Sequence, residues 1–231
     1  MEKHTLFPNK RLTAWGIGYL LFQLLVLPTI LSLFLLILEL PWDESKLNML
    51  YYTVNFGVLV GIFWRFLQDN LRHALENIGA VLLPAVVGFF VYRFSSTVVD
   101  MVIYGIFPDF YNVNDANINS MAQGQLPMWA FATIVLVPPV EELLFRGTLF
   151  GGFYSKHKVL AWILSVLGFA LVHVIGYIGY YSWDMLLLCT IQYLPAGICF
   201  AAAYRASGNI FTPILMHSAI NAIAMIAMAT M

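Results

Sequence analysis

Three ionisable side chains lie together in a stretch that is otherwise apolar enough to sit in lipid. Glu141, Glu142 and Arg146 fall within residues 137–147, and most residues around them are apolar. An ionisable side chain at membrane depth costs at least ~2.5 kcal/mol on insertion scales and usually marks a functional site. The spacing of Glu142 and Arg146 predicts an ion pair along one helix face. The Glu141 side chain projects about 100° around the helix from Glu142, so this ion pair leaves it available for another role.

Two further stretches carry groups that could complete such a site. His173 ends the run 169–173, and the four-residue spacing of His217 and Asn221 puts imidazole and carboxamide on one helix face. A carboxylate and an imidazole can activate a water molecule, and an amide or imidazole N–H can stabilise an oxyanion. Counted at about 1.5 Å per residue, Glu141, His173 and His217 fall in or beside the middle third of a bilayer. We therefore expect one buried cavity between three helices.

The composition indicates an integral membrane protein. The 231 residues are 61% hydrophobic and only 10% charged, with a mean hydropathy of +0.82. A soluble domain has a far higher charged fraction. The net charge of −1 argues against a nucleic-acid partner, and two cysteines in one apolar run form neither a disulfide framework nor a thiolate metal motif. We predict an all-α polytopic transmembrane bundle, with residues 1–231 forming a single integral-membrane domain.

The apolar runs predict seven membrane-spanning helices, at about 14–40, 47–67, 78–107, 128–153, 159–180, 183–204 and 209–231. We expect Pro28 to bend the first, and Pro138 with Pro139 to kink or interrupt the fourth just before the carboxylates. The segments 68–77 and 108–127 are polar and are predicted to be connectors. The second holds Asp109, Asp115 and several asparagines but no basic residue.

The lysines and arginines near the span ends predict the orientation. The side of the N-terminus would carry Lys3, Lys10, Arg11, Arg65, Arg72, Lys156, Lys158 and Arg205, whereas the opposite side would carry Lys46. Basic residues are enriched on the cytoplasmic side of membrane proteins. We therefore expect a multi-pass protein of the cell membrane with a cytoplasmic N-terminus and, for seven spans, an external C-terminus.

The three ordered motifs resemble those of a known family. Glu141-Glu142-x-x-x-Arg146, Phe169-x-x-x-His173 and His217-x-x-x-Asn221 are similar to the motifs of the CPBP family of intramembrane proteases, which comprises type II CAAX prenyl proteases and bacteriocin-processing (Abi) proteins. The resemblance covers a core of about residues 128–231. Because eukaryotic members usually have an additional span, it leaves the count at seven or eight.

The resemblance implies roles for the motif residues. Glu141 and His173 would hold and deprotonate the attacking water, while His217 and Asn221 would stabilise the oxyanion. Glu142 and Arg146, with Phe169, would support the site. A zinc ion held by Glu141, His173 and His217 is possible, but there is no H-E-x-x-H motif, and we favour a glutamate mechanism without metal or other cofactor.

The function expected from these features is hydrolysis of peptide bonds in a membrane-associated peptide or protein. The resemblance implies prenylated C-a-a-X proteins as substrates in eukaryotes, and peptide maturation, bacteriocin self-immunity or signalling-peptide processing in bacteria. The substrate and the oligomeric state are therefore open. The alternative is a non-catalytic bacteriocin-immunity or scaffold protein that keeps the motif residues for helix packing. A small transporter is poorly supported, because the sequence shows no convincing inverted repeat.

Overall fold

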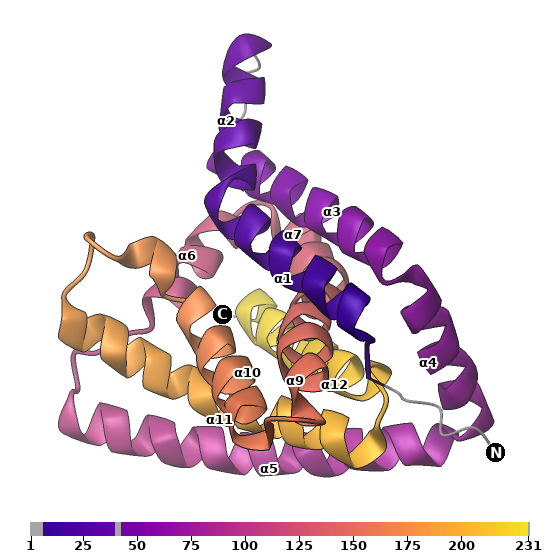
Figure 1. The fold of residues 1–231 in the computed structure, drawn as a ribbon. Coiled ribbons are helices and arrows are strands. Elements are labelled where there is room, and N and C mark those ends of the chain that lie inside the picture. Colours follow the sequence, from indigo (N-terminus) through magenta and orange to yellow (C-terminus); the bar gives the residue numbers. More distant parts are fainter. Residues whose placement is uncertain (1–6, 40–42, 231) are drawn as a thin grey trace.

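The computed structural model describes residues 7–39 and 43–230, and in these ranges the regular structure is helical, apart from an isolated bridge between Ile178 and Tyr181. The helices pack into one bundle (Figure 1). This confirms the predicted all-α class. Lys3, one of the residues used to predict the orientation, lies outside the described ranges.

Helices follow one another with short connections along the described chain. One long composite helix, 126–154, consists of α7 (Leu126–Phe131), the π-helical segment η1 (Ala132–Leu136), α8 (Val137–Glu142), the π-helical segment η2 (Leu143–Gly151) and α9 (Gly152–Tyr154). The other elements are α1 (Lys10–Leu25), α2 (Leu27–Ile37), α3 (Glu44–Ile62), α4 (Trp64–Glu76), α5 (Ile78–Ile106), α6 (Val113–Ala122), α10 (Lys158–Val172), the 3-10 turn η3 (Ile175–Tyr177), α11 (Trp183–Ser207) and α12 (Phe211–Ala229).

Four of these helices are long and apolar enough to cross a membrane: α5, the composite helix, α11 and α12. The number rises to six if the bent pairs α1 with α2 and α3 with α4 each count as one span. The chain is thus a helical, multi-pass membrane protein. The expected fifth span, 159–180, is shorter than predicted, because α10 has 15 residues and ends at Val172. The total of seven or eight spans stays a prediction.

Two bends shape the N-terminal half. The chain bends by 49° between α1 and α2, next to Pro28, and α2 projects away from the body of the bundle (Figure 1). This confirms the predicted bend. The 78° bend between α3 and α4 was not predicted, and the presumed connector 68–77 is mostly helix. That helix is held by long-range contacts, since Asn70 accepts from the backbone N–H of Ile210 and its carbonyl accepts from Asn209.

The second presumed connector, 108–127, also contains a helix. Asn112 caps the start of α6, where its Oδ1 accepts from the backbone N–H groups of Asn114 at 3.0 Å and Asp115 at 3.2 Å. Asparagine is among the preferred N-cap residues because its side chain satisfies backbone donors left over at a helix start. The prediction that 108–127 is only a connector was therefore wrong, because its polar residues include a capped, mostly polar helix.

The composite helix is continuous through both prolines, so the expected interruption is absent. Pro138 and Pro139 lack the backbone N–H that an α-helix would use at these positions. The helix has a π register on each side of the prolines, over 132–136 and 143–151, and just before them Val137 N–H donates to the Ala132 carbonyl. Such π-helical turns are frequent at functional sites.

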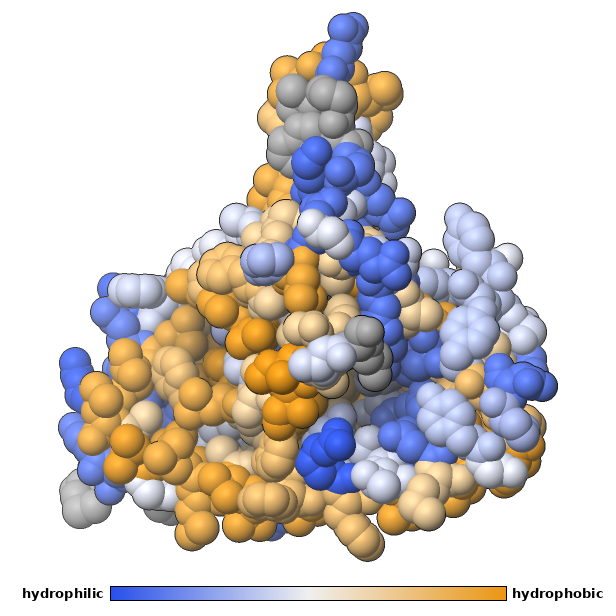
Figure 2. Space-filling model, turned by 180° about the vertical axis from the view of Figure 1, so that it is seen from behind, coloured by the Kyte–Doolittle hydropathy of each residue, from blue (hydrophilic) through white to orange (hydrophobic). Residues whose placement is uncertain are grey.

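The surface of the bundle suits lipid. Helix α5, which runs beside α11, exposes Phe90, Phe94 and Met101, and Figure 2 shows apolar side chains over the lower edge where α5 lies. Large exposed apolar surfaces of this kind are rare on soluble monomers. Several chain segments predicted to be cytoplasmic also meet at one end, where Phe7 packs on Tyr204 and the Arg205 guanidinium lies over Tyr154. The direction in which that end faces remains a prediction.

Candidate active site

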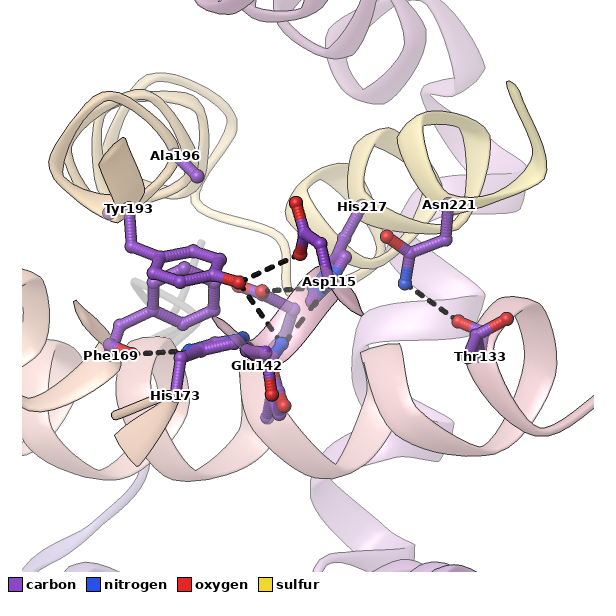
Figure 3. Close-up of polar contacts among 12 residues, drawn as sticks. Asp115, Thr133, Glu142, Phe169, His173, Tyr193, Ala196, His217 and Asn221 are labelled. Carbon is purple, nitrogen blue, oxygen red and sulfur yellow. Dashed lines mark hydrogen bonds and ion pairs between the residues drawn. The ribbon is translucent and has the colours of Figure 1, made fainter. Parts of the chain in front are cut away.

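The motif residues converge from three helices. Glu141 and Glu142 end α8, His173 follows the last residue of α10, and His217 with Asn221 lies on α12. Figure 3 shows the Glu142, His173, His217 and Asn221 side chains gathered between these elements. The prediction that carboxylate, imidazoles and carboxamide share one buried region therefore agrees with the structure.

Glu141 faces both histidines. Its Oε2 lies 3.9 Å from Nε2 of His173 and 4.0 Å from Nε2 of His217. These distances are too long for direct hydrogen bonds, but two hydrogen bonds of about 2.8 Å that meet at about 90° join atoms about 4 Å apart. Glu141 Oε2 is buried and accepts no hydrogen bond from the described residues. The distances from Glu141 to the two imidazoles therefore match those expected for a single bridging water molecule.

The partners of the histidines define which ring nitrogen carries a proton. His173 Nδ1 lies 2.7 Å from the Phe169 carbonyl oxygen, and a carbonyl can only accept, so Nδ1 donates. This bond also satisfies a carbonyl at the end of α10, which explains why the helix can stop there. In the neutral ring, Nε2 of His173 is then an acceptor that faces Glu141.

Glu142 and Arg146 form the predicted ion pair, with Nη1 and Oε1 3.2 Å apart and both side chains fully buried. Glu142 has a second partner that spacing could not reveal: its Oε1 accepts from Nδ1 of His217 at 2.9 Å. Buried charges are tolerated when they are paired and hydrogen-bonded. Glu142 thus fixes His217 in the orientation that presents Nε2 to Glu141.

Arg146 ties the composite helix to α10 and α11. Its Nη2 donates to the Gly197 carbonyl at 3.2 Å, and its guanidinium lies 4.3 Å from the ring centroid of Phe169. Gly197 permits the close approach of α11 to α10, because a Cβ there would lie 3.1 Å from the Val166 carbonyl oxygen. Phe169 therefore touches two parts of the site, with its ring under Arg146 and its carbonyl on His173.

Asn221 is anchored by a carbonyl that Pro138 leaves free. In the π register the Thr133 carbonyl would accept from the N–H of residue 138, which proline lacks. The Asn221 amide takes its place, with Nδ2 donating to Thr133 O at 2.7 Å (Figure 3). An amide nitrogen has two N–H groups. Among the described residues, the second N–H of Asn221 has no acceptor and is available for another one.

Sequence reasoning missed one residue beside the site, Tyr193 of α11. Its ring stacks on the His173 imidazole with centroids 4.1 Å apart and an interplanar angle of 23°. No spacing pattern marks this residue, because its contact with His173 depends on how α10 and α11 pack. The asparagines and Asp115 of the segment 108–127, which the structure brings to the Tyr193 hydroxyl, were the available signal.

The three candidate zinc ligands are spaced more widely than a tetrahedral zinc ion requires. Tetrahedral zinc with bonds of about 2.0–2.1 Å places its ligand atoms about 3.4 Å apart, whereas Glu141 Oε2 lies 3.9 and 4.0 Å from the two imidazole nitrogens. Among the described residues, no group of three His, Cys, Asp or Glu side chains is arranged to hold a metal ion. The side chains as they stand do not fit zinc, and the cofactor requirement stays a prediction.

The fold and the site define a class of protein: a multi-pass helical membrane protein with a buried carboxylate and imidazole site. Residues 123–223 match the family described as Type II CAAX prenyl endopeptidase Rce1-like, and this segment contains every motif residue named above. Over these residues the chain is similar to this family, in agreement with the CPBP family that the motifs indicate. This similarity supports, at family level, a membrane endopeptidase of the CAAX type.

Bacterial relatives support the same family. YdiL of Bacillus subtilis, named as a candidate membrane peptidase, is 27% identical over 190 residues, which cover 78% of this chain and 73% of YdiL. The UPF0177 protein YbdI of Lactococcus lactis is 25% identical over 186 residues, covering 78% of this chain and 91% of YbdI. The UPF0177 protein YxdF of the same species is 38% identical over 100 residues, 42% of this chain and 50% of YxdF. No solved structure matches the chain significantly.

Proposed function

We propose that the protein is an intramembrane endopeptidase in which Glu141 and His173 activate a water molecule. The observation that carries the proposal is the geometry around Glu141 Oε2, which lies 3.9 Å from Nε2 of His173. A water molecule there would donate one hydrogen to each of the two acceptors, which leaves an oxygen lone pair for attack on a peptide carbonyl.

The proton path follows from this placement. As the water oxygen bonds to the peptide carbon, one of its protons passes to the Glu141 carboxylate. The carbonyl oxygen becomes the oxyanion of a tetrahedral intermediate. When the C–N bond breaks, Glu141 returns the proton to the leaving nitrogen, so the products are a carboxylic acid and an amine, and Glu141 is again a carboxylate.

His217 and Asn221 are the proposed donors to the oxyanion. Because Nδ1 of His217 donates to Glu142, Nε2 can donate as well only when the ring is an imidazolium. In that state the charges of Glu141, Glu142, Arg146 and His217 sum to zero, which suits a buried cluster. Asn221 would contribute the N–H that Thr133 does not use. Preorganised donors of this kind lower the barrier to acyl transfer.

The substrate proposed is a membrane-associated peptide or protein, prenylated or not. The side chains of Glu141 and His173 are 19% and 14% exposed, so the proposed water site is sheltered yet reachable, whereas Glu142 and Arg146 are sealed. Lateral entry from the bilayer would bring a peptide bond to this depth without passage through bulk water.

The test is cleavage by purified protein in proteoliposomes. Quenched-fluorescent peptides, one set carrying a farnesylated C-a-a-X end and one set without lipid, would be offered to wild type and to Glu141→Gln. The variant keeps shape but cannot accept the proton, and we expect its rate to fall by about 10²–10⁴-fold. Cleavage by Glu141→Gln at the wild-type rate would refute the proposal.

The same pair of proteins addresses the non-catalytic alternative. If the protein acts only by binding, Glu141→Gln protects cells against a bacteriocin as well as wild type does. Loss of both cleavage and protection in Glu141→Gln, with the variant still folded, supports the protease.

A further inference from the structure

Tyr193 contacts the proposed water-activating histidine face to face. Its ring and the His173 imidazole are stacked, with centroids 4.1 Å apart and an interplanar angle of 23°. His173 Nδ1 is already fixed by the Phe169 carbonyl at 2.7 Å. The hydrogen bond fixes one point of the imidazole, and the stack fixes the plane of the ring. Together they hold Nε2 towards Glu141.

The Tyr193 hydroxyl is itself held by the start of α6. It donates to Asp115 Oδ1 at 2.9 Å and accepts from Asn114 Nδ2 at 3.0 Å, as Figure 3 shows for Asp115. Asn112 Oδ1 lies 3.3 Å from the same hydroxyl. A hydrogen bond to an ionised carboxylate is stronger than one between neutral groups. The ring that packs on His173 is thus fixed at its far end.

The anchor extends to α5. Asn112 Nδ2 donates to Gln192 Oε1 at 2.9 Å, and Gln192 Nε2 donates to Asp100 Oδ1 at 2.8 Å. The polar side chains of α5, α6 and α11 therefore form one connected network around Tyr193. Networks in which each member is satisfied make a local structure rigid.

We propose that Tyr193 is a positioning residue for His173, and that the capped start of α6 holds Tyr193 in place. The inference rests on the proposed function, in which His173 binds the reacting water. It assigns a role to Asn112, Asn114 and Asp115, which precede residues 123–223 and so lie outside the segment that matches the family. Catalysis then depends on a polar helix that carries no motif.

The experiment compares three variants by kcat and KM in proteoliposomes. Tyr193→Leu removes the stack, and Tyr193→Phe keeps the stack but removes the hydroxyl. Tyr180→Phe is the control, because the Tyr180 side chain is exposed and, among the described residues, makes no hydrogen bond to this network. We expect kcat to fall by up to about 100-fold in Tyr193→Leu and less in Tyr193→Phe, with KM nearly unchanged, because misplacement by about 1 Å costs about 100-fold.

A spectroscopic measurement tests the contact without any substrate. An aromatic ring stacked on an imidazole shields its protons. In protein labelled at histidine, the His173 ring proton resonances should move downfield in Tyr193→Leu and stay in place in Tyr180→Phe. Unmoved resonances in a folded Tyr193→Leu would overturn the inference. If Tyr193→Leu does not fold, Tyr193→Phe provides the test. A wild-type kcat in Tyr193→Phe would overturn the proposal that the hydroxyl contacts hold Tyr193 in place.

The Glu141→Gln variant, run beside these, separates the two proposals. If Glu141→Gln is inactive while both folded Tyr193 variants keep wild-type kcat, the positioning role is refuted and the protease stands. If Glu141→Gln is fully active, the proposed function itself is refuted, whatever the Tyr193 variants show.

Discussion

Glu142 and His217, 75 residues apart in the chain, are joined by a hydrogen bond of 2.9 Å between Oε1 and Nδ1. The same Oε1 lies 3.2 Å from Nη1 of Arg146. One carboxylate oxygen therefore serves both a local ion pair along the composite helix and a long-range contact with α12. Glu142 therefore has two roles: it stabilises the buried charge of Arg146, and it orients His217.

Removal of the Glu142 charge should destabilise the protein. Glu142→Gln leaves Arg146 fully buried without its carboxylate, and breaking a buried pair typically costs about 3–5 kcal/mol. Unfolding in detergent would measure the loss. The double variant Glu142→Gln with Arg146→Met should recover much of the stability but not the cleavage rate, since His217 still lacks a charged acceptor. Recovery of full activity in the double variant would contradict the orienting role.

Loss of the His173 imidazole should abolish cleavage and leave the fold intact. His173→Ala removes the acceptor that holds the water opposite Glu141, and we expect a rate lower by about 10²–10⁴-fold. His157→Ala is the matched control, because His157 is exposed in the connection before α10. Thermal unfolding in detergent would show that both variants fold. Equal activity in the two would remove His173 from the mechanism.

Asn221 and Pro138 should be coupled in a double-mutant cycle. Asn221→Ala leaves the Thr133 carbonyl without its donor, and an unsatisfied buried acceptor costs about 1–3 kcal/mol. Pro138→Ala supplies a backbone N–H that can take this carbonyl. The Asn221→Ala substitution should therefore cost less stability in the Pro138→Ala background than in wild type. Equal costs in the two backgrounds would show that Pro138 does not free the carbonyl.

Activity should be indifferent to metal removal. The distances from Glu141 Oε2 to the two imidazoles, 3.9 and 4.0 Å, match a bridging water better than a tetrahedral zinc ion. Purified active protein should thus contain zinc well below one ion per chain and keep its rate in a strong chelator. Stoichiometric zinc, with activity lost on chelation and restored by zinc, would move the mechanism to a metal.

Several features were determined by the sequence alone, because they depend on local periodicity. Long apolar runs predict helices wherever they occur, and α5, α11 and α12 begin and end close to the predicted limits. The pairing of Glu142 with Arg146 also follows from residue type and helical spacing. The motifs indicated the family for the same reason, since their residue types and order are read directly from the chain.

Other features were decided only by tertiary structure, because they depend on contacts between distant residues. Helices α4 and α6 are too polar for an apolar pattern to predict, and they are held by partners such as Asn209 and Tyr193. α10 ends at Val172 where the His173 side chain satisfies the Phe169 carbonyl. The contacts of His217 with Glu142, and of Tyr193 with His173, exist only once α8, α10, α11 and α12 have packed together. Spacing along one helix shows which side chains share a face, but only packing decides what that face meets.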